Sequence, residues 1–344
     1  MRTRYSEDQQ AVGEAFGELF ARESTAEAVR AAEAGCGFDR GLWDKLALAG
    51  APGMAAPATD GGGGASLVDL AVVVYEWGRR IAPVPLVEHA VVARLLCAGA
   101  SRRAPDGLRE AVVSGELVAT LALRPAETGG TARLVPAGAV AGVVAGLRGG
   151  DLVLGRGEPP GRARPNTADL PLADRDLSAA VVLASGESAR EAFDAALTEW
   201  KALMSVAYTG LASEVLAMGV AYVKQRHQFG VPVGSFQAVQ HGLADAATRA
   251  EGARLLAFRA ACAVDAADAG APRLASMALL LSAESARFAS DRVLQYHGGY
   301  GYSAEYDVQL YYRRAAAWLL QLGDPAAEVA RLADAELGHK IGAA

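Results

Sequence analysis

Residues 221–245 decide the fold, and they read AYVKQRHQFGVPVGSFQAVQHGLAD. A helical pattern ends near Gly230, a short loop follows, and Ser235 is placed to cap the next helix. Arg226 comes one turn before this break, so it places a fixed cation at the end of a helix. The stretch therefore predicts two long helices joined by a short connection that carries an arginine.

A second segment follows a helical pattern over residues 274–294. Residues 295–302 read QYHGGYGY, and Arg313 and Arg314 come shortly afterwards. Gly298 and Gly299 remove side chains at a helix end, which lets a bulky partner approach the backbone. The five tyrosines nearby are expected to be core and interface residues: Tyr300, Tyr302, Tyr306, Tyr311 and Tyr312.

The pattern outside these two segments divides the chain into three. Residues 1–113 show helical periodicity, and residues 191–344 return to it. Between them, residues 114–190 carry short apolar runs separated by Gly, Pro and Asp, which is typical of strands and turns. The sequence therefore predicts a mainly α protein with a small middle β domain.

Taken together, the two segments resemble the acyl-CoA dehydrogenase family, whose pattern is Arg-x-x-Phe-Gly, a Phe-Gln pair and a later Gln-x-x-Gly-Gly. The matching residues are Arg226, Phe229, Gly230, Phe236, Gln237, Gln295, Gly298 and Gly299. The resemblance extends more weakly to residues 60–64 and 76–79. It implies an N-terminal helical domain, a β domain and a C-terminal four-helix bundle.

This resemblance also implies FAD, bound across a subunit interface. Arg226 would offer a forked donor to the pyrophosphate, and Gln237 and Gln295 would supply amide hydrogen bonds. Gly298 and Gly299 would permit close backbone approach. The aromatic members of the set, Phe229 and Phe236, complete the expected cofactor site.

The family reaction, α,β-dehydrogenation of an acyl-CoA, needs a glutamate base. Most members place it where this chain has Leu322, and a minority place it where this chain has Trp200. Leucine cannot take a proton. Glu199 is one residue away, about 100° around a helix, so it remains an alternative base. No catalytic residue is otherwise expected in this chain.

The middle segment departs from the family too. Residues 123–131 lack the usual Ser-Asp pair, and no tryptophan lies between Trp77 and Trp200. The resemblance is therefore to the base-lacking subunit of actinobacterial α2β2 enzymes, some of which act on steroid side-chain CoA thioesters. It implies a homologous catalytic partner that holds most of the acyl-CoA, with electron-transfer flavoprotein as acceptor. Two alternatives stay open: a homotetramer that uses Glu199, and a helical scaffold without cofactor.

Composition excludes other classes. The net charge of −6 gives no basic footprint for nucleic acid. The three cysteines are far apart, and neither His241 nor His297 has metal-ligand spacing, so no metal site is expected. No uncharged apolar run is long enough to cross a bilayer, and residues 1–8 show no secretory pattern. The expected location is the cytoplasm.

Overall fold

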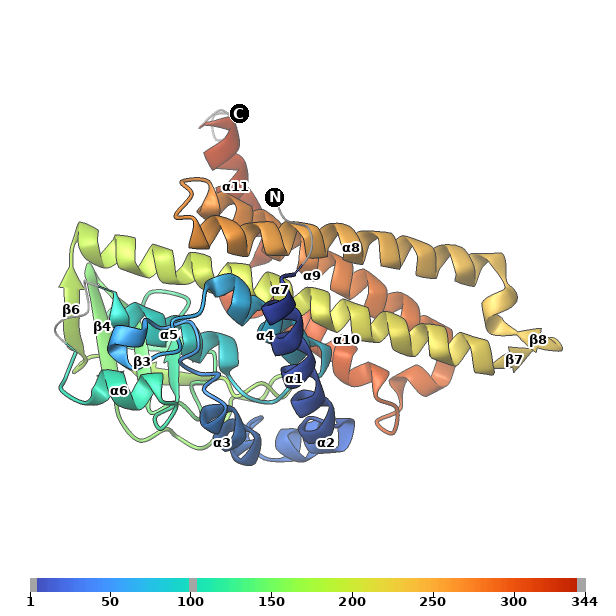
Figure 1. The fold of residues 1–344 in the computed structure, drawn as a ribbon, viewed down its shortest axis with the longest axis horizontal. Coiled ribbons are helices and arrows are strands. Elements are labelled where there is room, and N and C mark those ends of the chain that lie inside the picture. Colours follow the sequence, from blue (N-terminus) through green and yellow to red (C-terminus); the bar gives the residue numbers. More distant parts are fainter. Residues whose placement is uncertain (1–4, 99–103, 339–344) are drawn as a thin grey trace. The chain divides into compact units, whose positions relative to one another are not determined.

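A computed structural model describes residues 5–98 and 104–338 of the chain (Figure 1). Contacts divide it into two compact units that alternate along the sequence. Unit 1 comprises Met1–Ala21, Ala71–Ala82 and Lys201–Ala344, and unit 2 comprises Arg22–Leu70 and Pro83–Trp200. Helices α4 (Leu67–Arg79) and α7 (Glu187–Gln225) each contribute residues to both units.

Unit 1 is built from long helices. Besides parts of α4 and α7 it contains α1 (Glu7–Glu23) as far as Ala21, α8 (Gln237–Asp265), α9 (Ala271–His297), η4 (Gly298–Tyr302), α10 (Val308–Ala317), η5 (Leu319–Leu322) and α11 (Pro325–Leu337). Ser6 caps the start of α1, because Gln9 N donates to Ser6 Oγ at 3.2 Å. Acidic Glu7 and Asp8 fill the first turn, where the helix dipole favours negative charge.

Helices α8 and α9 pack closely in unit 1. A short connection separates them, since α8 ends at Asp265 and Pro272 lies in the first turn of α9. Small side chains allow the close approach, and the cluster in this region is almost entirely alanine. Its buried members are Ala202, Ala260, Ala263, Ala271, Leu274, Ala275 and Ala278.

Unit 2 begins with short helices that start at side-chain caps. It contains α2 (Ala26–Ala34), α3 (Arg40–Leu48), η1 (Ala58–Asp60), α5 (Leu86–Cys97) and α6 (Leu108–Val113). Thr25 accepts from Ala28 N at 3.2 Å and Asp39 from Leu42 N at 2.9 Å. Trp43 is fully buried, and its indole N–H donates to Gly115 O at 2.9 Å.

The strands follow in unit 2. One sheet has the order β1 (Ala119–Leu121), β3 (Val143–Arg148), β4 (Asp151–Arg156) and β6 (Val181–Ser185), and a separate pair joins β2 (Thr131–Val135) to β5 (Ala173–Asp176). Among the strand pairs of unit 2 in the described residues, β1 and β3 run parallel and the other pairs run antiparallel. The expectation of a mainly α protein with a small middle β segment is confirmed. The three predicted domain boundaries remain predictions.

His89 is a fully buried histidine on α5 whose two ring nitrogens are both used. Nδ1 accepts from Ala119 N at 3.0 Å, so Nε2 carries the proton and donates to Val112 O at 2.8 Å. Burial lowers the pKa of His89 to about 4. The imidazole therefore ties α5 to both α6 and β1 in its neutral form.

Acidification should destabilise the chain through His89. The pKa of His89 in the folded chain lies below its unfolded value. Its contribution to the free energy of unfolding is therefore fully present above about pH 6.5 and is lost as the pH falls towards 4. The free energy of unfolding should fall by about 2 kcal/mol between pH 7.5 and pH 5. Urea unfolding of wild type and His89→Gln at several pH values measures it. The pKa of buried Glu88 is raised by desolvation, but that contribution is common to both proteins. Parallel pH profiles would contradict the prediction.

Candidate functional site

A short hairpin follows α7 in unit 1. Strand β7 (His227–Gln228) pairs with β8 (Val231–Pro232), and Phe229 and Gly230 form the turn with φ of 54° and 82°. Two positive φ values define the mirror-image turn that suits a tight hairpin, but a phenylalanine is strained there. The phenylalanine ring is nevertheless 93% exposed. The hairpin lies at the end of α7 (Figure 1) and presents an exposed aromatic side chain.

Arg226 lies between the last residue of α7 and this hairpin. Its backbone N–H donates to Tyr222 O at 2.9 Å, and its carbonyl accepts from Val233 N at 2.7 Å. The guanidinium lies 5.8 Å from the centroid of the Tyr300 ring. No carboxylate pairs with it in the part of the chain that the structure describes. The two segments singled out in the sequence therefore meet here, at an exposed cation.

The glycine segment turns back from the end of α9. Gly298 has a φ of 61°, which favours glycine. At Gly301, a Cβ would lie 2.5 Å from Leu294 O, so the backbone of η4 packs directly on the last turn of α9. Around Gly298 and Gly299, in contrast, no atom lies within 4 Å of a Cβ position. The first part of η4 therefore leaves open space beside its backbone.

The remaining predicted cofactor residues lie on the ends of α8 and α9. Phe236 precedes α8 and meets Phe229 edge to face, with centroids 6.2 Å apart. Gln237 begins α8, Gln295 lies in the last turn of α9, and both are exposed. Neither amide makes a side-chain hydrogen bond within residues 5–98 and 104–338. Both amides are available to a ligand, and in the described structure neither forms a hydrogen bond with Arg226.

The start of α8 corrects one detail of the sequence analysis. Phe236, not Ser235, occupies the N-cap position, and it supplies no side-chain hydrogen bond. The hydroxyl of Ser235 donates to Pro232 O at 2.7 Å, because the chain makes a 3-10 turn there before α8 begins. The expected core position is confirmed for Tyr311, which is buried, whereas Tyr300 and Tyr302 are 49% and 77% exposed in this chain and their interface role stays a prediction.

Sequence reasoning missed the ring assembly behind Arg226. His297 stacks on Tyr222 with centroids 3.9 Å apart, and Tyr306 contacts both His297 and Tyr300. These side chains come from α7, from α9 and from the segment between η4 and α10. The only sequence signal for the assembly was the density of tyrosines after Gly298. The assembly fixes the ring against which Arg226 rests.

The positions considered for a catalytic base hold no free carboxylate. Trp200 is fully buried, and its indole lies 3.4 Å from buried Glu88. Glu199 lines a pocket of about 260 Å³ between α5 and α7 in unit 2. Both of its oxygens accept from Arg94, at 2.9 and 3.0 Å. Leu322 ends η5, and the residues after it form the cap of α11.

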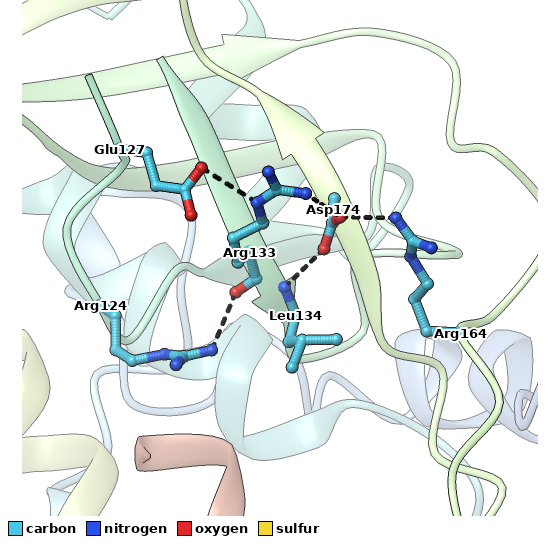
Figure 2. A network of polar contacts seen from close by, with 6 residues as sticks. All are labelled: Arg124, Glu127, Arg133, Leu134, Arg164 and Asp174. Carbon is cyan, nitrogen blue, oxygen red and sulfur yellow. Dashed lines mark hydrogen bonds and ion pairs between the residues drawn. The ribbon is translucent and has the colours of Figure 1, made fainter. Parts of the chain in front are cut away.

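A polar network covers part of the β2–β5 pair in unit 2 and includes residues from the segment 123–131. Figure 2 shows its members, which are Arg124, Glu127, Arg133, Leu134, Arg164 and Asp174. Asp174 accepts from Arg133 at 3.0 Å and from Arg164 at 2.7 Å. The backbone N–H of Leu134, aided by both arginines, lowers the pKa of this carboxyl. The arginine and carboxylate groups of this surface thus largely satisfy one another.

Within the described residues, no group of three or more His, Cys, Asp or Glu side chains could hold a metal ion. Among those residues one helix, α7, is long and apolar enough to cross a membrane, but 67% of its apolar window is buried inside the protein. That degree of burial is typical of the core helix of a globular protein.

The fold and this site define a helical subunit that presents a cation, open backbone and aromatic rings at one end of a bundle. Family models of acyl-CoA dehydrogenase match the chain over residues 6–114 for the N-terminal domain and 191–333 for the C-terminal domain. The chain belongs to the acyl-CoA dehydrogenase family.

Similarity to known proteins covers almost the whole chain. The acyl-CoA dehydrogenase IpdE2 of Mycolicibacterium smegmatis (strain ATCC 700084 / mc(2)155) is 30% identical over 95% of this chain and 98% of its own. A variant of the steroid ACAD Tcur3481–Tcur3483 superposes with a TM-score of 0.85 at 28% identity, covering 96% and 98% of the two chains. The ChsE4–ChsE5 complex from Mycobacterium tuberculosis gives 0.84 at 26% identity, covering 99% and 100%.

FAD is the cofactor that membership of this family assigns. The residues at the end of unit 1 fit its adenine and pyrophosphate half. Arg226 supplies a cation without a carboxylate partner in the described chain, and the space beside Gly298 and Gly299 is open. A forked donor and close backbone approach suit a diphosphate.

Proposed function

We propose that this chain is the subunit of an α2β2 acyl-CoA dehydrogenase that holds the adenine and pyrophosphate half of a FAD shared with a catalytic partner. The partner is a homologous subunit that supplies the glutamate base and the flavin face and holds most of the acyl-CoA. The substrate class is an acyl-CoA thioester such as a steroid side-chain CoA. Electron-transfer flavoprotein is the proposed acceptor, and the cytoplasm is the proposed location.

One contrast carries this proposal. At the Arg226 end of unit 1, the exposed guanidinium and the open space beside the backbone of Gly298 and Gly299 can accommodate an anionic ligand. In unit 2, part of residues 123–131, which lack the family's Ser-Asp pair, contributes to an ion-pair network. Leu322 in unit 1 and Trp200 in unit 2 stand where the family places its base. A cofactor divided between two subunits explains both features.

Each residue at the Arg226 end has a role in this division. When bound, FAD accepts a hydride from the β-carbon of the substrate. Arg226 holds the pyrophosphate with paired N–H donors, Gln237 and Gln295 offer amide hydrogen bonds, and Phe229 covers the cofactor. Gly298 and Gly299 admit the nucleotide close to the backbone. None of these groups moves a proton, so their contribution is binding and orientation.

Two solved relatives support the heteromeric assembly. The solved complexes with 28% and 26% identity carry two subunit names each, Tcur3481–Tcur3483 and ChsE4–ChsE5, and the first is described as a steroid ACAD. The steroid substrate class for this chain is inferred from that description.

Flavin content tests the proposal. The chain is purified alone and as a complex with a co-expressed homologous subunit, and flavin absorbance is measured per chain. We expect little flavin and no acyl-CoA dehydrogenation from the chain alone, and FAD for about half of the chains in the complex. Full FAD occupancy with dehydrogenation by this chain alone would overturn the proposal.

Glu199 provides a second check, because it is the residue on which a self-sufficient enzyme would depend. Both of its oxygens are held by Arg94. Glu199→Gln should therefore leave the turnover of the complex unchanged, while it lowers the stability of the chain by about 1–3 kcal/mol through loss of a charged hydrogen-bond pair. Steady-state kinetics and urea unfolding measure the two effects. Loss of turnover with retained fold would instead favour the homotetramer.

A further inference from the structure

His297 is a buried side chain at the Arg226 end of unit 1. It is the last residue of α9, it is 6% exposed, and its ring stacks on Tyr222 at an interplanar angle of 21°. Tyr222 O–H also donates to the His297 carbonyl at 3.4 Å. The Cβ of His297 lies 3.3 Å from the Cβ position of Gly301. Position and plane of the imidazole are therefore fixed by packing on several sides.

The hydrogen bonds of this ring determine its chemistry. Nδ1 lies 2.8 Å from Val293 O, and because a carbonyl can only accept, Nδ1 carries the proton. Burial lowers the pKa of His297, so the ring is neutral near pH 7. Nε2, on the opposite edge, then has a lone pair and no proton. The side chain presents a hydrogen-bond acceptor.

That acceptor has no protein donor. No hydrogen bond to Nε2 occurs among the residues that the structure describes. Nε2 is not one of the fully buried side-chain atoms without a partner among the described residues, so it is accessible at the surface of the fold. In the free protein such an acceptor is hydrated, and a ligand that displaces this water must supply a donor in its place.

The same assembly of rings connects His297 to Arg226. The ring centroid of Tyr306 lies 6.2 Å from that of the imidazole and 5.3 Å from that of Tyr300. The Tyr300 ring in turn lies under the Arg226 guanidinium. On the proposed function, Arg226 binds a pyrophosphate, which has no donor to offer at neutral pH. The donors of the adjoining adenosine are the exocyclic amine of adenine and the ribose hydroxyls.

We propose that His297 is a specificity-determining residue for the cofactor, and that its Nε2 accepts a hydrogen bond from a donor group of the adenosine. This inference rests on the proposed function. It adds a residue that discriminates among nucleotides to an arginine that recognises only their phosphates.

Calorimetric titration of the flavin-free complex, assembled with the co-expressed homologous subunit, with ADP tests the inference. His297→Phe keeps a ring against Tyr222 and removes the acceptor, whereas His297→Gln keeps an acceptor and removes the ring. We expect His297→Phe to bind ADP about tenfold more weakly and His297→Gln to stay within about threefold of wild type. Circular dichroism and thermal unfolding check that each variant is folded. Arg226→Ala is titrated as well, because it should lose ADP binding. Its matched control is Arg259→Ala, which removes an exposed arginine about six turns along α8 from Gln237.

Two analogues identify the donor. Inosine diphosphate lacks the amine, and 2′,3′-dideoxy-ADP lacks the ribose hydroxyls. One of them should bind wild type about tenfold more weakly than ADP does, and this difference should disappear in His297→Phe. If both His297 variants weaken ADP equally, or if neither analogue is discriminated, the ring has a packing role only and the inference fails. If ADP binding is lost in Arg226→Ala but unchanged in His297→Phe, the inference fails and the proposed function stands. If wild type binds no ADP at all, both fail.

Discussion

Replacing Arg226 with alanine should remove most of the FAD from the assembled enzyme. The guanidinium is exposed, lies over Tyr300 and has no carboxylate partner in the described chain, so its donors are free for a diphosphate. A hydrogen bond to a charged group contributes about 1.5–3 kcal/mol. We therefore expect FAD affinity to fall about 10- to 100-fold. Flavin absorbance after gel filtration and titration of the apo complex measure the loss.

Two further variants make this prediction specific. Arg226→Lys keeps the charge but loses the fork, so its affinity should lie between those of wild type and Arg226→Ala. Arg259→Ala removes an exposed arginine at a distance and should retain full flavin content. If Arg226→Ala also retains its flavin and the complex keeps its activity, the chain is a helical scaffold without a role in cofactor binding.

The sequence predicted those parts of the site that depend on local chemistry. Arg226 and the Gly298–Gly299 pair could be recognised because a helix end, a turn and two adjacent glycines are local features. The open space beside both glycines agrees with their expected role in close backbone approach. The open end of α8 was less predictable, since Ser235 and Phe236 compete for the cap within a short 3-10 turn.

Long-range pairs could not be predicted in the same way. The Arg94–Glu199 pair joins residues 105 positions apart, and it changes the meaning of Glu199 from a possible base to an ion-pair partner. The stack of Tyr222 on His297 spans 75 positions. Periodicity indicates which face of a helix is buried, but it does not indicate which residue of another helix that face meets.

The buried ion pair between Lys201 and Glu328 holds the C-terminal helix α11, and its removal is expected to have the second large effect, a loss of stability. Lys201 Nζ lies 2.5 Å from Glu328 Oε1 and 3.1 Å from Ser276 Oγ. The two charged side chains are 6% and 2% exposed, and Glu328 also meets Arg331. Among the described side chains of α11, only Glu328 is buried. The pair therefore connects α11 to the interior of unit 1.

Glu328→Ala should destabilise the chain by about 3–5 kcal/mol, because it leaves the Lys201 ammonium in the interior without its carboxylate. Lys201→Met should cost less, since Glu328 keeps Arg331 and methionine fills a similar volume. The double variant Lys201→Met with Glu328→Leu should recover most of the loss, as apolar replacement of a whole buried pair often does. Arg331→Ala, which removes the exposed partner, is the control and should cost less than about 1 kcal/mol. Urea unfolding gives the free energies, and hydrogen exchange over residues 324–335 shows whether α11 opens first. An equal loss for Glu328→Ala and Arg331→Ala would contradict this account, because the exposed partner would then matter as much as the buried one.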